Sequence, residues 1–113
     1  MTTNRKSSLT NAAGEIFGVL SDPTRRTIFE SLRESPKAVV ELARAMPISR
    51  PAVSQHLKVL KNAGLVSDVA IANRRVYSLN PAGLSPLRDY LDGFWNIALA
   101  NYATAARKRR AKR

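Results

Sequence analysis

The chain has 113 residues, no cysteine, one histidine and a formal net charge of +11. The lack of cysteine excludes disulfides, thiolate metal ligands and cysteine nucleophiles, and a single histidine argues against a histidine-based zinc site, so we expect no metal and no cofactor. The excess of cations instead predicts a polyanionic partner, and double-stranded DNA is the first candidate.

The length predicts one small domain at residues 10–106, between a flexible N-terminal tail at 1–9 and a basic C-terminal tail at 107–113. The sequence shows no glycine-rich phosphate loop, nucleophile elbow or paired-carboxylate pattern, so we do not expect an enzyme. No apolar run approaches the roughly 20 residues of a membrane-spanning helix, and no signal peptide is visible. We therefore expect a cytoplasmic protein with no membrane partner.

Two helices are predicted before the first loop. Ile16, Phe17 and Leu20 recur at helical spacing and indicate the first helix. Asp22 followed by Pro23 is a helix-start signal, because the carboxylate can cap the first turn and proline is tolerated at its first position. A second helix should run from there to about residue 32.

A helix-turn-helix is predicted in the middle of the chain. Residues 34–37, ESPK, are expected to form a loop, and residues 39–46 a short third helix that Pro47 ends. Only Pro47 and Ile48 separate this helix from Ser49, which is a suitable cap for the next one. So short a link between a short helix and a longer one is typical of a helix-turn-helix.

The fourth helix, residues 49–61, combines a core stripe with a polar face. At about 100° per residue, Val53, Leu57 and Leu60 fall on one sector that must face a core. The opposite face carries polar and cationic groups that suit base edges and phosphates. The alternative is a solvated amphipathic helix with no ligand. The candidate DNA-binding residues are Ser49, Arg50, Ser54, Gln55, His56 and Lys58.

A β-hairpin follows, because residues 65–71 and 74–79 are β-rich and a short polar turn separates them. Asn73, Arg74 and Arg75 lie at its tip, where arginine can reach a narrow minor groove. An ordinary solvated charge is the alternative. A helix-turn-helix followed by a hairpin predicts a mainly α fold with a small β-hairpin, the winged helix-turn-helix.

A long aromatic helix is predicted after Asn80 and Pro81, with a brief first turn before the main part. Its apolar residues form one broad stripe that so small a domain cannot cover by itself. A second subunit is expected to cover it, with the first helix packed beside it, which predicts a homodimer. The candidate interface residues are Ile16, Phe17, Leu20, Leu87, Tyr90, Leu91, Phe94, Trp95, Ala98 and Tyr102.

The motifs together resemble a known family. They are DPTRR at 22–26, VVELARAM at 39–46, ISRPAVSQHLKVLKNAGLV at 48–66 and RRVYSLNPAGL at 74–84. The chain is similar, from about residue 14 to 102, to the ArsR/SmtB-type transcriptional repressors, and most of all to a metal-independent subgroup that contains autorepressors. The resemblance implies a homodimer built from the first and last helices, which binds an inverted-repeat operator and blocks transcription.

Two points stay open within this resemblance. It implies that Ser54, Gln55 and His56 approach bases, whereas the helical projection favours the first two and leaves His56 either packed or bound to a phosphate. Metal-sensing relatives carry cysteines in the third helix, where this chain has VVELA at residues 39–43. The resemblance therefore does not identify a small-molecule effector. A winged-helix protein-interaction module and a non-specific nucleic-acid binder are the alternatives to a specific repressor.

Overall fold

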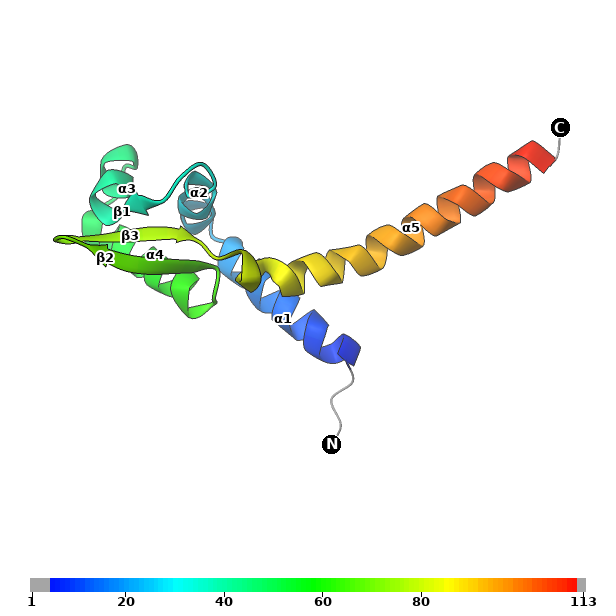
Figure 1. The fold of residues 1–113 in the computed structure, drawn as a ribbon, viewed down its shortest axis with the longest axis horizontal. Coiled ribbons are helices and arrows are strands. Elements are labelled where there is room, and N and C mark those ends of the chain that lie inside the picture. Colours follow the sequence, from blue (N-terminus) through cyan, green and yellow to red (C-terminus); the bar gives the residue numbers. More distant parts are fainter. Residues whose placement is uncertain (1–4, 112–113) are drawn as a thin grey trace.

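The computed structural model describes residues 5–111, with side chains from residue 10 onward (Figure 1). Helices dominate, and two of the three strands of a small sheet form a hairpin between the fourth and the last of them, so the predicted mainly α winged helix-turn-helix is confirmed. The elements are α1 Arg5–Leu20, α2 Pro23–Ser31, β1 Lys37–Ala38, α3 Val39–Ala45, α4 Arg50–Asn62, β2 Val66–Ile71, β3 Arg74–Leu79, the 3₁₀ helix η1 Pro81–Leu84 and α5 Ser85–Ala111.

The sheet has three antiparallel strands in the order β1-β3-β2. The predicted hairpin is present, with Val66 opposite Leu79 at its base and Ile71 opposite Arg74 at its tip. The prediction of a loop over residues 34–37 was wrong at its end, because Lys37 begins β1 and pairs with Tyr77 of β3. A strand of two residues has no periodicity to detect, and only its partner strand defines it.

Both outer helices extend into segments that were expected as tails. Helix α1 begins at Arg5, so residues 5–9 are helical, while residues 1–4 lie outside the described residues. Helix α5 continues to Ala111 through the basic run at residues 108–110, and residues 112–113 lie outside the described part. Cations in the last turn of a helix are attracted to the negative end of the helix dipole. This attraction offsets part of the repulsion between the cations.

The DPTRR motif joins α1 to α2. The Asp22 carboxylate caps α2 by accepting a hydrogen bond of 2.8 Å from the backbone N–H of Arg25, which lowers the pKa of that carboxyl. The Arg25 side chain donates to the Val19 carbonyl at 2.7 Å, and Arg26 donates to the Leu20 carbonyl at 3.1 Å. Both arginines therefore bind carbonyl groups at the C-terminal end of α1, which the helix itself leaves unpaired.

Helix α4 begins and ends as its sequence predicts. The Ser49 hydroxyl accepts a hydrogen bond of 3.2 Å from the Ala52 N–H, and Pro51 lies in the first turn. Gly64 follows the helix with a φ of 78°, a left-handed conformation that glycine adopts without strain. The chain then turns directly into β2, so α4 and the hairpin are adjacent.

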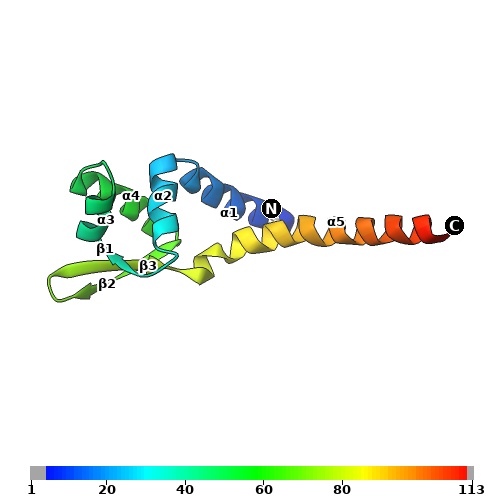
Figure 2. The same ribbon diagram turned by 90° about the horizontal axis from the view of Figure 1, so that it is seen from above.

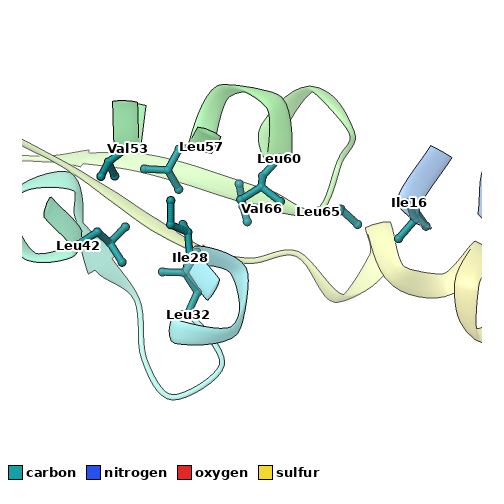
Figure 3. Close-up of a cluster of buried hydrophobic side chains, with 9 residues drawn as sticks. All are labelled: Ile16, Ile28, Leu32, Leu42, Val53, Leu57, Leu60, Leu65 and Val66. Atoms are coloured by element: carbon teal, nitrogen blue, oxygen red, sulfur yellow. The ribbon is translucent and has the colours of Figure 1, made fainter. Parts of the chain in front are cut away.

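One hydrophobic core holds α4 in place. The predicted inward residues Val53, Leu57 and Leu60 are completely buried, and they pack with Ile28 of α2 and Leu42 of α3 (Figure 3). Leu65 and Val66 extend the cluster to the base of the sheet, and Ile16 of α1 and Leu32 complete it. Because this core fixes the rotation of α4, it determines which of its residues face outward.

Helix α5 extends away from this core (Figures 1 and 2). It has 27 residues and contains no buried residue. At a rise of about 1.5 Å per residue, it is roughly 40 Å long. No helix in the described part of the chain is both long enough and apolar enough to cross a membrane. The exposed stripe therefore lies on a helix that the chain itself leaves largely uncovered.

Replacing Leu57 with alanine should lower the free energy of unfolding by about 2–5 kcal/mol, because it removes completely buried methyl groups and leaves a cavity. Urea denaturation followed by circular dichroism measures the change. Lys58→Ala, at the next position and exposed, is the control and should change the free energy by less than about 0.5 kcal/mol. Equal losses for the two variants would contradict the assigned rotation of α4.

Candidate DNA-binding interface

The outward face of α4 is polar and cationic. Arg50, Ser54, Gln55 and Lys58 are all exposed, as the helical projection predicted. An amide and a hydroxyl can hydrogen-bond to base edges in a major groove, and cations beside them can bind phosphates. Ser49 is also exposed, but its hydroxyl is used in capping the helix. The face has the chemistry that groove recognition needs.

The hairpin projects beyond α4 as a wing, defined here as residues 66–79 (Figure 1). Its two-residue turn is Ala72 and Asn73, and Ala72 has a φ of 55°. A positive φ suits the tight turn of a hairpin. Arg74 and Arg75 open β3 directly after this turn, and both are exposed. The wing therefore presents its cations close to its tip.

The structure brings the recognition helix and the wing together around one hollow. Its volume is about 240 Å³, and residues 38–40, at the junction of β1 and α3, also border it. Arg50 and Ser54 from α4 line it on one side. Asn73, Arg74 and Arg75 from the wing line it on the other. Residues from separate elements, each a sequence-predicted DNA contact, thus form a single concave cationic surface.

Two carboxylates bind the wing arginines. The Arg74 guanidinium lies 3.4 Å from the Glu41 carboxylate of α3, and the Arg75 guanidinium lies 3.2 Å from the Asp68 carboxylate of β2. Asp68 also binds the Lys61 ammonium at 2.7 Å, and its side chain is only 6% exposed. The hydrogen bond from Lys61 is the main cause that lowers the pKa of Asp68. The wing is thereby fixed to the end of α4.

Sequence reasoning missed Glu41, Lys61 and Asp68. Glu41 and Arg74 are 33 residues apart, and no local pattern connects them. Lys61 and Asp68 are closer in sequence, but their contact depends on the sharp turn at Gly64 between α4 and β2. The sequence offered one general signal. The chain has only eight acidic residues, and each of them is a candidate ion-pair partner for one of its many cations.

His56 differs from its neighbours on α4. It is half-buried, whereas Ser54, Gln55 and Lys58 are exposed. Packing within the domain and contact with a phosphate or a base all remain predictions for His56.

The predicted interface residues divide into two groups. Ile16 is buried in the chain's own core, and Leu20 and Leu87 pack against that core. Phe17 and Tyr90 meet edge to face, with ring centres 6.0 Å apart, and so join α1 to α5. The other group is exposed on α5: Leu91, Phe94, Trp95, Ala98 and Tyr102, with Ile97 and Leu99 beside them.

Among the described residues, no group of three or more histidine, cysteine, aspartate or glutamate side chains is placed to hold a metal ion. The hollow between α4 and the wing and the exposed apolar stripe of α5 are two distinctive surfaces of the described residues.

Residues 22–68 match the family model described as "Bacterial regulatory protein, arsR family". The HTH-type transcriptional regulator Rv2034 of Mycobacterium tuberculosis is 61% identical over 84 residues, which are 74% of this chain and 78% of that protein. The transcriptional repressor SdpR of Bacillus subtilis is 35% identical over 81 residues, which are 72% of this chain and 90% of that protein. The match therefore extends from the DPTRR motif into the wing and beyond it.

Solved structures share the fold. The homodimeric winged helix-turn-helix DNA-binding domain of Mb0332 from Mycobacterium bovis, residues 1–100, matches with a TM-score of 0.66. The two sequences are 22% identical, and the match covers 88% of this chain and 93% of that domain. At this identity the likeness supports the fold alone.

Asp68→Asn should lower the free energy of unfolding at pH 7 and flatten its decline in acid. The folded pKa of Asp68 is lowered, so its contribution is present above about pH 4, its unfolded pKa, and is lost as the pH falls further. Urea titrations at pH 7, 5 and 3 measure this. Asp89→Asn, on the exposed surface of α5, is the control, and an equal effect there would refute the role of the Lys61–Asp68–Arg75 cluster.

Proposed function

Because the chain belongs to the ArsR family of bacterial regulatory proteins, we propose that it acts as a homodimeric repressor on an inverted-repeat operator. The family consists of DNA-binding transcriptional regulators, not enzymes. The observation that carries the proposal is the hollow where α4 and the wing meet, because it unites predicted DNA contacts from both elements. Repression is further supported by the name of SdpR, a transcriptional repressor.

Base recognition is assigned to α4. Gln55 is exposed almost opposite Val53, Leu57 and Leu60, and Ser54 is exposed beside that core sector. A major groove can therefore reach both while the core stays intact. An amide that makes two hydrogen bonds to adenine discriminates it from other bases by about 1–3 kcal/mol. Lys58 carries a charge without such directional donors and acceptors, so we assign it to the phosphate backbone.

Homodimerisation is supported by the exposed stripe on α5. Phe94, Trp95 and Tyr102 are 60%, 66% and 73% exposed, although aromatic side chains are the largest contributors to buried interfaces. Covering an aromatic side chain removes up to about 150–250 Å² from water, so these three supply a large part of a stable interface and the other exposed apolar residues of α5 add to it. The homodimeric state of the Mb0332 domain is consistent with this proposal.

Regulation without thiol or metal sensing is the third part of the proposal. The chain has no cysteine and one histidine, so a thiolate site cannot form and a histidine site would lack further imidazole ligands. Where metal-sensing relatives carry cysteines, residues 39–43 of this chain are VVELA, and Leu42 among them is buried in the core. We therefore propose that occupancy of the operator depends on protein concentration or on a non-metal signal.

Gln55→Ala should reduce discrimination between an operator selected from random duplexes and a scrambled duplex, because it removes a base contact. Lys58→Ala should instead weaken binding to both duplexes and reduce the slope of log K against log salt by about one. Fluorescence anisotropy across a salt titration measures both effects. Equal affinity of the unchanged protein for the two duplexes would contradict a sequence-specific repressor.

Leu91→Glu should shift the protein from dimer to monomer, because it places a carboxylate within the stripe that the partner covers. Ile71→Glu is the matched control, since Leu91 is 50% and Ile71 is 55% exposed, and Ile71 lies at the wing tip. Sedimentation velocity at micromolar concentration measures the mass. A monomeric unchanged protein, or an unchanged mass for Leu91→Glu, would contradict the assigned interface.

A further inference from the structure

We infer that the hollow between α4 and the wing seats one phosphate of the DNA backbone, and that Glu41 competes with this phosphate for Arg74. The inference rests on the proposed DNA binding and extends it to a specific contact and its internal competitor.

Besides Ala38, Val39 and Val40, the hollow is lined by polar groups that suit a phosphate diester. Arg50, Arg74 and Arg75 border it, and guanidinium groups bind phosphate oxygens with paired, planar hydrogen bonds. The Ser54 hydroxyl and the Asn73 amide add neutral donors at the same rim. These cations come from the recognition helix and the wing, so neither element forms the site alone.

The size and place of the hollow point to the same ligand. A volume of about 240 Å³ lies below the roughly 300–1,000 Å³ of pockets for drug-sized ligands, but it is large enough for one phosphate group with a few waters. DNA strands run between a major groove and the neighbouring minor groove. A helix in one groove and a wing reaching the other therefore place the intervening backbone at the hollow.

The two wing arginines differ in their availability to a phosphate. Arg75 binds Asp68, whose side chain is only 6% exposed and which also binds Lys61 at 2.7 Å. If a phosphate took Arg75 from Asp68, this poorly solvated carboxylate would lose one of its two cationic partners. Arg74 binds Glu41 at 3.4 Å, with side chains 55% and 48% exposed. Ion pairs so exposed contribute little stability, so Arg74 is the cation that can exchange its carboxylate for a phosphate.

Glu41 is held beside the hollow by a second contact. Its Oε1 atom accepts a hydrogen bond of 3.2 Å from the backbone N–H of Ala38, just before α3. When a phosphate replaces Glu41 as the partner of Arg74, the hydrogen bond from Ala38 keeps the Glu41 carboxylate close to the hollow. The negative charge of the carboxylate then repels the phosphate. Glu41 thus weakens binding to every DNA sequence and limits the non-specific affinity of a chain with a net charge of +11.

The test is Glu41→Gln, because the glutamine oxygen can still accept the hydrogen bond from Ala38 while the charge is lost. Affinity for a random-sequence duplex should rise about three- to tenfold at low salt, the effect of one unit charge in a partly solvated site. Glu30→Gln on α2 is the matched control, since Glu30 is exposed and outside the hollow, and it should change affinity less than twofold.

A double substitution isolates the contact. With Arg74→Gln already present, Glu41→Gln should give a smaller gain, because competition for Arg74 is gone and only the repulsion between the carboxylate and the phosphate is left to remove. An equal gain from Glu30→Gln, no gain from Glu41→Gln, or a full gain in the Arg74→Gln background would each overturn the inference. Free inorganic phosphate that saturates the protein at micromolar concentration and displaces the duplex would overturn it too, since the hollow would then bind a small anion.

The inference and the proposed function can fail separately. If the unchanged protein binds random and selected duplexes equally, the specific repressor is refuted, and the effect of Glu41→Gln on the random duplex is still measured. If the protein prefers its selected operator but Glu41→Gln does not raise affinity, only the phosphate seat is refuted.

Discussion

The burial of one sector of α4 is the constraint on which the rest of the structure depends. Val53, Leu57 and Leu60 are completely buried against α2 and α3, and a helix has only one rotation that achieves this. Gln55 and Lys58 must then face outward. The polar face of the recognition helix is therefore a consequence of core packing, and its direction is as rigid as the core itself.

Polar contacts transmit this rigidity to the long helices. Arg25 and Arg26 bind carbonyl groups at the end of α1, and the Asn80 amide donates to the Gly64 carbonyl at 2.8 Å, joining the start of η1 to the turn after α4. Gly83 packs so closely against that turn that a side chain would collide with the Gly64 carbonyl. A dimer formed through α5 would thus hold two recognition helices at a defined spacing, as an inverted repeat requires.

Local signals made most of the helices predictable from the sequence. Asp22, Ser49 and Gly64 mark helix ends through hydrogen bonds or dihedral angles that depend on near neighbours, and the structure confirms each of them. What the sequence did not reveal is non-local. Strand β1 exists only by pairing with β3, and the ion pair of Glu41 with Arg74 joins residues far apart in the chain. No periodicity encodes such contacts, so five residues that line the hollow could be predicted as separate DNA contacts, but the hollow itself could not.

The distribution of charge explains how a very basic chain can still be selective. Cations bind any polyanion, and the run at residues 108–110 near the end of α5 has no geometry that distinguishes one sequence from another. The wing arginines do have a defined geometry. Glu41 pairs with Arg74 and Asp68 pairs with Arg75, so both arginines are oriented before any ligand arrives. Pairing lowers the attraction of these arginines for stray phosphates and fixes their direction. Selectivity then depends on carboxylates placed beside the binding groups as much as on the binding groups themselves.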